Sequence, residues 1–182
     1  MDLSTKLLET SNFYEIFSLP PGWQIDRSLL DSRYRQLQRE FHPDRFAAKG
    51  DVEKRLAVQA TSLINQAYET LKCPLKRAQY MLELESIDAD QESHITSDAS
   101  FLMAQIEFRE KLEEIRDSAD PLAGLESMRD NVQIQYLQLQ EDFQAQHSAA
   151  NYNDALDTVA KMQFFAKLLD EIEQREEELE DF

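Results

Sequence analysis

The segment LLDSRYRQLQREFHPDRF, residues 29–46, runs from an amphipathic pattern into a stop at a proline. Its apolar residues recur at spacings of four, three and four, as on one face of a helix: Leu30, Tyr34, Leu37 and Phe41. Pro43 cannot continue that helix, so His42 and Asp44 are expected to project from a loop between two helices. This segment therefore predicts a helical hairpin with a polar tip.

A second helix is predicted beyond the loop, from about Asp51. Its apolar residues have the same helical spacing: Leu56, Ala60, Leu63, Ala67 and Leu71. Two antiparallel helices would pack through these stripes. Shorter helices are expected on either side of the pair, one after the N-cap candidate Asn12 and one from Pro74 to about Leu84.

Three further helical patterns follow a polar stretch, and they cover about 98–116, 121–147 and 151 to nearly 182. The connections between them are short, which implies neighbouring antiparallel helices and hence a three-helix bundle. We therefore predict an all-α protein with three parts: an N-terminal domain over 1–84, a linker over 85–95 and a C-terminal three-helix bundle over 96–182.

The composition favours a helical protein and argues against several functions. Among 182 residues there are only 3 Gly and 5 Pro, too few for the turns of a sandwich or a barrel. A net charge of -17 argues against nucleic-acid binding, which needs a basic face. The single cysteine, Cys73, excludes an internal disulfide and suits a reducing compartment. No apolar run approaches the roughly 18 residues of a membrane span, so we expect a cytoplasmic protein.

The charge is divided unevenly between the two predicted domains. Residues 1–84 carry a net charge of +1, and residues 85–182 carry a net charge of -18. This difference indicates two units with different partners. The acidic run from Glu176 to Glu178 is expected to be solvated surface rather than a site.

The first 84 residues resemble a known family. The triplet His42-Pro43-Asp44, between two helices of matching length, is the signature of the J-domain. The stretches NFYEIF (12–17) and INQAYETL (64–71) resemble the family's opening helix and the close of its third helix. The resemblance covers about residues 11–84 and implies a domain that stimulates ATP hydrolysis by a DnaK-class chaperone.

The resemblance also implies which residues meet that chaperone: His42, Pro43, Asp44, Arg35, Arg39 and Arg45. At 100° per residue, Arg35 and Arg39 point roughly 130 to 170° away from the buried stripe and toward solvent. Asp44 would offer a carboxylate to an arginine of the chaperone. None of these residues needs to be catalytic, because the ATP and its chemistry belong to the partner.

The helix predicted over 98–116 has apolar residues on two sides. One set defines the face that we assign to the bundle interior: Phe101, Phe108, Leu112 and Ile115. Leu102, Met103 and Ile106 average roughly 150° from that face. Three carboxylates rim this trio: Glu107, Glu110 and Glu114. From the residues alone, the trio is either a second packing surface or a partner site.

The whole chain resembles the HscB family, the short J-proteins of bacterial iron-sulfur cluster assembly. The matches include Phe101-Leu102-Met103, Glu107, Arg109-Glu110, Leu112, Asn65-Gln66-Ala67 and Asp181-Phe182. The family's architecture implies an L-shaped molecule whose bundle binds the scaffold IscU while its J-domain engages the chaperone HscA. The implied scaffold contacts are Leu102, Met103, Ile106, Glu107, Glu110, Glu114 and Phe164. Phe164 and Phe165 are adjacent, and the sequence leaves open which of them faces the scaffold.

Three alternatives stay open beside this interpretation. They are a general J-protein that presents unfolded clients, a helical adaptor whose triplet is a relic, and an enzyme with a carboxylate metal site in the bundle. The sequence carries no Gly-rich phosphate loop and no nucleophile elbow. We therefore expect no catalytic residue, no metal, no cofactor, and no nucleic-acid or membrane partner.

Overall fold

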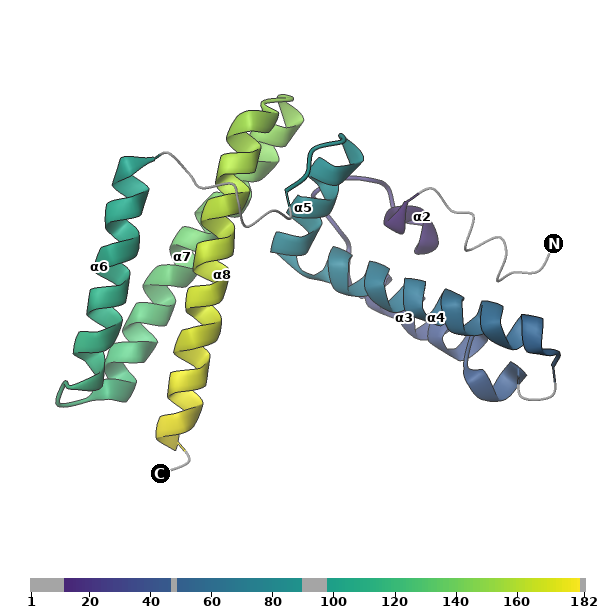
Figure 1. Ribbon diagram of the computed structural model, residues 1–182, viewed down its shortest axis with the longest axis horizontal. Coiled ribbons are helices and arrows are strands. Elements are labelled where there is room, and N and C mark those ends of the chain that lie inside the picture. The colour runs from purple at the N-terminus through teal and green to yellow at the C-terminus, as the bar shows by residue number, and fades with distance from the viewer. Residues whose placement is uncertain (1–11, 47–48, 90–97, 181–182) are drawn as a thin grey trace. The chain divides into compact units, whose positions relative to one another are not determined.

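A computed structural model describes residues 12–46, 49–89 and 98–180, and no strand occurs among them. The chain divides into two compact units, the first ending at Met81 and the second beginning at Leu82. The described residues form helices joined by short connections (Figure 1). The prediction of an all-α protein is confirmed.

The first unit is built on a pair of antiparallel helices. It contains α2 (Phe13–Ile16), α3 (Arg27–Glu40), the short 3-10 helix η1 (Pro43–Phe46), α4 (Asp51–Lys72) and the start of α5 (Pro74–Leu84). Helices α3 and α4 lie side by side (Figure 1). The sequence predicts a loop without regular structure between these helices. The structure differs, because the 3-10 helix η1 begins at Pro43, two residues after the α3 C-cap at Phe41.

The core of the first unit follows the predicted stripes in part, because Leu56 and Leu63 of the second stripe are only partly buried while Ile64, outside that stripe, is fully buried. The fully buried members of this core come from α2 and its C-cap, α3 and α4: Tyr14, Phe17, Leu30, Ala60, Ile64, Ala67 and Leu71. Small alanine side chains on α4 let α3 approach closely, and the rings of Tyr34 and Tyr68 stack across the two helices at a centroid distance of 3.9 Å. Trp23, in the connection between α2 and α3, stacks against the guanidinium of Arg77 at 4.5 Å.

Helix starts in both units are set by side-chain caps. The Oδ1 atom of Asn12 accepts a hydrogen bond from the backbone N–H of Glu15, and Asp26 and Asp120 cap α3 and α7 in the same way. Each cap satisfies an N–H group that has no partner inside its helix. The predicted helix boundaries therefore agree with the structure to within one or two residues.

The second unit contains a three-helix bundle of α6 (Ala99–Arg116), α7 (Pro121–Ser148) and α8 (Tyr152–Glu180). The backbones of α7 and α8 pack along their length, and α6 approaches them less closely. The core is apolar, and its fully buried members include Leu112, Met128, Val132, Phe143, Met162, Leu168 and Ile172. The bundle predicted from the sequence is confirmed.

One close approach fixes the turn between α6 and α7. A Cβ atom on Gly124 would lie only 2.9 Å from the Cγ2 atom of Ile115. Glycine is therefore needed at position 124 for space, since the backbone of α7 lies against a β-branched side chain of α6. This contact brings the end of α6 against the start of α7.

The expected exposure of the acidic run was wrong for Glu176. This residue is buried, and its Oε2 atom lies 2.6 Å from the Nη1 atom of Arg129 on α7. At 100° per residue, position 176 lies about 40° from the buried Ile172, on the core side of the helix. Glu177 and Glu178 are exposed, as predicted.

The predicted boundaries of 1–84, 85–95 and 96–182 stay predictions. Helix α5 continues across the division between the two units and ends at Leu84. Ala89, inside the predicted linker, is buried, and its carbonyl accepts a hydrogen bond from Gln163 Nε2 at 3.4 Å. The rest of the predicted linker, 90–95, lies outside the described residues, as do Asp181 and Phe182.

Candidate functional site

The His-Pro-Asp triplet lies in the connection between α3 and α4, with Pro43 and Asp44 opening η1. The side chain of Asp44 is 92% exposed, and that of His42 is 58% exposed. The Nδ1 atom of His42 accepts a hydrogen bond from the backbone N–H of Asp44 at 3.3 Å. This bond orients the imidazole locally and leaves the carboxylate of Asp44 facing solvent, where a partner's cation can reach it.

The loop is anchored from both sides. Phe41 is buried at its start, and the ring of Phe46 at its end lies 6.5 Å from that of Phe41. The hydroxyl of Thr61 on α4 donates to the carbonyl of Phe41 at 3.2 Å. Buried neighbours thus hold an exposed polar tip, which is a common arrangement of binding loops on a rigid framework.

The three predicted arginines are exposed around this tip. Arg35 and Arg39 lie on the solvent side of α3, as the helical geometry predicted. The guanidinium of Arg45 donates to the carbonyl of Arg39 at 3.4 Å, which brings η1 and the end of α3 together. The structure thus places Arg39, Arg45 and the triplet in one region and gives that region a positive charge beside the Asp44 carboxylate.

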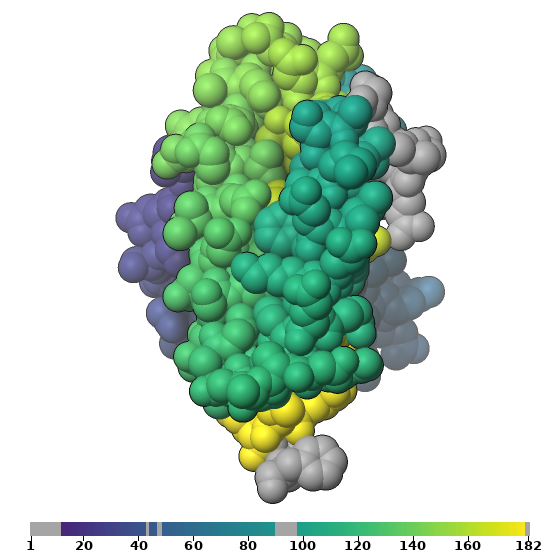
Figure 2. All heavy atoms as spheres, turned by 90° about the vertical axis from the view of Figure 1, so that its left-hand side faces the viewer, coloured from purple at the N-terminus to yellow at the C-terminus, as the bar shows by residue number. Residues whose placement is uncertain are grey.

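The second candidate surface lies on α6. Leu102, Met103 and Ile106 are 38%, 59% and 52% exposed, whereas Leu112 and Ile115 of the predicted interior face are buried. Within the second unit the trio is therefore not a packing surface. Figure 2 shows α6 and α7 lying side by side, with the outer side of α6 open to the viewer. Exposed apolar side chains grouped on one helix face are typical of a protein-binding surface.

Charged residues differ on the two flanks of the trio. The three predicted carboxylates are exposed and lie on one flank by helical geometry: Glu107, Glu110 and Glu114. On the other flank lies Arg109, whose guanidinium pairs with Glu171 of α8 and sits 5.8 Å from the ring centroid of Phe164. No functional role was predicted for Arg109 from the sequence. Its place between the trio and the interior face is nevertheless visible in the helical spacing.

The two adjacent phenylalanines of α8 divide their roles. Phe165 is buried in the bundle, while Phe164 is half-buried. The ring of Phe164 meets those of Phe101 and Phe108 at centroid distances of 5.6 and 6.3 Å. Phe164 is therefore the member of the pair that combines contact with α6 and access to solvent.

Ion pairs join α6 to α8 at both ends. Near its start, Asp98 lies 2.8 Å from the Nζ atom of Lys161; near its end, Glu113 lies 2.6 Å from Arg175. The hydrogen bond from Lys161 lowers the pKa of Asp98, and the bond from Arg175 lowers the pKa of Glu113. Both carboxylates are thus held in their charged form by the opposite helix.

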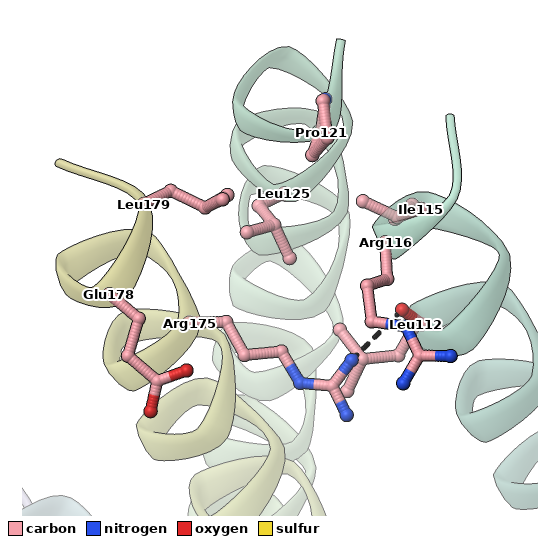
Figure 3. A pocket seen from close by; sticks show the side chains of 8 residues that line it. All are labelled: Leu112, Ile115, Arg116, Pro121, Leu125, Arg175, Glu178 and Leu179. Atoms are coloured by element: carbon pink, nitrogen blue, oxygen red, sulfur yellow. Dashed lines mark hydrogen bonds between the residues drawn. The ribbon is translucent and has the colours of Figure 1, made fainter. Parts of the chain in front are cut away.

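A cavity of about 410 Å³ lies where the three helices meet near the α6–α7 turn. Its walls come from all three helices (Figure 3), and its lining residues are Leu112, Ile115, Arg116, Pro121, Leu125, Arg175, Glu178 and Leu179. Across it, Arg175 donates to the carbonyl of Leu112 at 3.1 Å. The lining includes none of the predicted site residues, and Arg175 is engaged in holding α6.

No cluster of three or more His, Cys, Asp or Glu side chains in 12–46, 49–89 and 98–180 is arranged to hold a metal ion. Over the same residues, no helix has the length and apolarity needed to span a bilayer.

Two family models match this chain, one in each unit. The DnaJ domain matches residues 12–80, and the HSCB C-terminal oligomerisation domain matches residues 97–173. The chain is 42% identical over 173 residues to a co-chaperone protein HscB homolog of Shewanella sp. (strain ANA-3). That alignment covers 93% of this chain and 99% of the relative.

Solved structures agree with the sequence relatives. Chaperone HscB from Vibrio cholerae is similar with a TM-score of 0.84 and 39% identity, over 92% of this chain and 99% of that one. The human co-chaperone protein HscB is similar with a TM-score of 0.83 and 26% identity, over 92% and 83% of the two chains. With both domains matched in order, this chain belongs to the HscB family of J-domain co-chaperones.

Proposed function

We propose that this protein acts in iron-sulfur cluster biogenesis by bringing a cluster scaffold, IscU, to the DnaK-class chaperone HscA. The J-domain would stimulate ATP hydrolysis by the chaperone, and the bundle would hold the scaffold. The protein itself would perform no catalysis and would act in the bacterial cytoplasm. The observation that carries the proposal is the solvent exposure of Leu102, Met103 and Ile106 in a chain of this family.

The chemistry of the chaperone contact follows from the exposed triplet. Asp44 presents a carboxylate that is free to form a charge-assisted, bidentate pair with an arginine. Arg35, Arg39 and Arg45 supply positive charge beside it, which fits an acidic surface on the chaperone. The contact would favour the chaperone conformation that hydrolyses ATP, since a partner shifts an equilibrium only by binding one state more tightly.

The scaffold contact would use apolar burial with a charged border. Covering the trio and the exposed part of Phe164 removes apolar area from water, and the acidic flank of α6 gives the surface its orientation. Scaffold and chaperone are then held on two units of one chain, which raises their effective concentration toward each other.

Steady-state ATP hydrolysis by HscA, with and without IscU, tests both contacts. The wild-type protein should stimulate hydrolysis, and Asp44→Asn should abolish the stimulation in both conditions. A Leu102/Met103/Ile106 triple alanine variant should lose only the additional stimulation that depends on IscU. Glu69→Gln and Ile134→Ala serve as matched controls, because Glu69 is an exposed acid on α4 and Ile134 is a 68% exposed apolar residue on α7. Full stimulation by Asp44→Asn, or equal losses from Ile134→Ala and the triple variant, would contradict the proposal.

A further inference from the structure

We propose that Lys161 of α8 is a positioning residue for the scaffold-binding face: it holds the start of α6 against α8 and so fixes where Leu102 and Met103 lie relative to Phe164. This inference rests on the proposed function, and it concerns a residue that lies outside the exposed face itself.

The carboxylate of Asp98 fixes the start of α6, because it accepts hydrogen bonds both from the helix backbone and from α8. The Oδ1 atom of Asp98 accepts hydrogen bonds from the backbone N–H groups of Ser100 and Phe101 at 3.0 and 3.1 Å. Its Oδ2 atom accepts from the Nζ atom of Lys161 at 2.8 Å. The cap of α6 is thereby tied to the neighbouring helix, and the first turn of α6 cannot shift without breaking a charge-assisted hydrogen bond.

Lys161 is itself held in place. Its side chain is only 20% exposed, and its ammonium also pairs with Asp157, one turn earlier on α8, at 3.2 Å. The same ammonium lies 5.6 Å from the ring centroid of Phe101. A cation that meets two carboxylates and an aromatic face is more restricted than a surface lysine in a single ion pair.

The ring of Phe101 connects Lys161 to the exposed face. Phe101 packs edge-on against Phe164 at 5.6 Å, and Leu102 and Met103 follow Phe101 in the chain. A shift of Phe101 would therefore move the trio and Phe164 relative to each other. Binding surfaces that are already ordered lose less entropy when a partner docks, so this alignment should raise the affinity for the scaffold.

The position of α6 depends on side-chain contacts, because its backbone makes few close contacts with the other two helices of the bundle. The backbones of α7 and α8 approach each other far more closely than α6 approaches either of them. Among the described residues, long side chains join α6 to α8 through three ion pairs: Lys161 with Asp98, Arg109 with Glu171 and Arg175 with Glu113. Of the three, the pair at Lys161 lies nearest in sequence to Leu102 and Met103.

The test compares Lys161→Met with Lys161→Arg. Methionine keeps the length and the apolar stem but removes the charge, and arginine keeps the charge. Lys111→Met is the matched control, since Lys111 is exposed on α6 and lies roughly 130° from the trio by helical geometry. Two readouts are measured on the full chain: hydrogen-deuterium exchange of the first two turns of α6, and the dissociation constant for IscU.

We expect Lys161→Met to speed exchange in the first two turns of α6 about tenfold and to weaken scaffold binding by a similar factor, with exchange in α7 and α8 unchanged. Lys161→Arg and Lys111→Met should behave as the wild type. In the triple alanine background, Lys161→Met should cause no further loss of affinity, because it acts through that surface.

Two results would overturn the inference. Unchanged exchange in α6 would show that Lys161 does not fix the helix, and faster exchange with unchanged IscU affinity would show that the fastening does not serve binding. Failure of the proposed function is separate: there the triple alanine variant itself binds IscU as the wild type does, while the exchange measurement still reports on the fastening.

Discussion

At the scale of single residues, an exposed candidate contact and a buried core side chain lie only a few positions apart. Asp44 is exposed, and its Oδ2 atom lies 3.6 Å from the Nδ1 atom of His42. Phe41, three residues earlier, is buried in the core of the first unit. A substitution at Asp44 is therefore expected to spare the fold, whereas a substitution at Phe41 is expected to weaken it.

Substitutions at these two residues should separate the roles. Asp44→Asn should leave the free energy of unfolding within about 0.5 kcal/mol of the wild type, because an exposed loop carboxylate contributes little to packing. Phe41→Ala should lower it by about 3 to 5 kcal/mol through the cavity it creates. Urea unfolding followed by circular dichroism measures both. A destabilisation of several kcal/mol by Asp44→Asn would mean that the triplet has a structural role.

Tyr14 makes the first unit sensitive to alkali. Burial raises the pKa of its phenol to about 12, against the opposing effect of the Arg77 guanidinium. Above pH 10 the unfolded chain releases this proton while the folded chain keeps it, so the free energy of unfolding should fall by about 1.4 kcal/mol per pH unit up to about pH 12.

Urea unfolding of the wild type and of Tyr14→Phe between pH 10 and about 12 measures this effect. Phenylalanine cannot ionise, so the variant should show a smaller slope, with a lower starting stability from the lost hydrogen bond to Gly22. Equal slopes in the two proteins would assign the alkaline loss to other groups.

At the scale of helices, the sequence predicted what each element does alone and missed what depends on two of them together. The cap at Asn12 and the buried stripe of α3 follow from spacing and residue type within one helix. The burial of Glu176 depends on Arg129, 47 residues away, and the fastening of α6 depends on Lys161. No periodicity reveals such pairs, because they are set by the register between packed helices.

Gly124 gives a prediction about that register. Glycine to alanine usually stabilises a helix interior by about 1 kcal/mol. Here the new Cβ would lie 2.9 Å from Ile115 Cγ2, so Gly124→Ala should destabilise the bundle by about 1 to 3 kcal/mol. In an Ile115→Ala background the clash is removed, and the same change should be neutral or stabilising. Thermal unfolding of the four proteins gives the coupling; additive effects would contradict the proposed contact.

Acid should release α6 before the rest of the bundle. The pKa values of Asp98 and Glu113 are lowered from ordinary values of 3.8 and 4.5 by Lys161 and Arg175, so their stabilisation is complete above those values and is lost as the pH falls through the lowered ones. Hydrogen exchange at decreasing pH, corrected for the intrinsic rate, should show α6 opening first. Asp98→Asn with Glu113→Gln should flatten this pH dependence; a change confined to α7 and α8 would contradict it.

At the scale of the whole molecule, the uneven charge is the property that the sequence reveals most directly. The first 84 residues are nearly neutral with arginines beside the triplet, and the remainder carries -18. The two candidate surfaces therefore present opposite local charge. This difference disfavours the binding of either partner at the surface meant for the other. What composition could not supply is the division of labour between Phe164 and Phe165, because both lie on one helix and only packing distinguishes them.

The proposed association of the bundle with a scaffold should depend on salt. If the acidic surface steers a complementary partner, the association rate constant should fall several-fold between low and physiological ionic strength while the dissociation rate constant changes little. Stopped-flow measurements with IscU at several salt concentrations test this. A charge-reduced variant, Glu107→Gln with Glu110→Gln, should show a weaker salt dependence, and an association rate that ignores salt would contradict steering.

The single tryptophan gives the molecule a built-in spectroscopic label. Trp23 stacks on Arg77 within the first unit, and the second unit contains no tryptophan. Tryptophan emission therefore reports the unfolding of the J-domain alone, whereas far-ultraviolet circular dichroism reports helices of both units. The two melting curves of one unlabelled sample should differ wherever the units unfold separately, so the stability of the bundle can be read from their difference without dividing the chain.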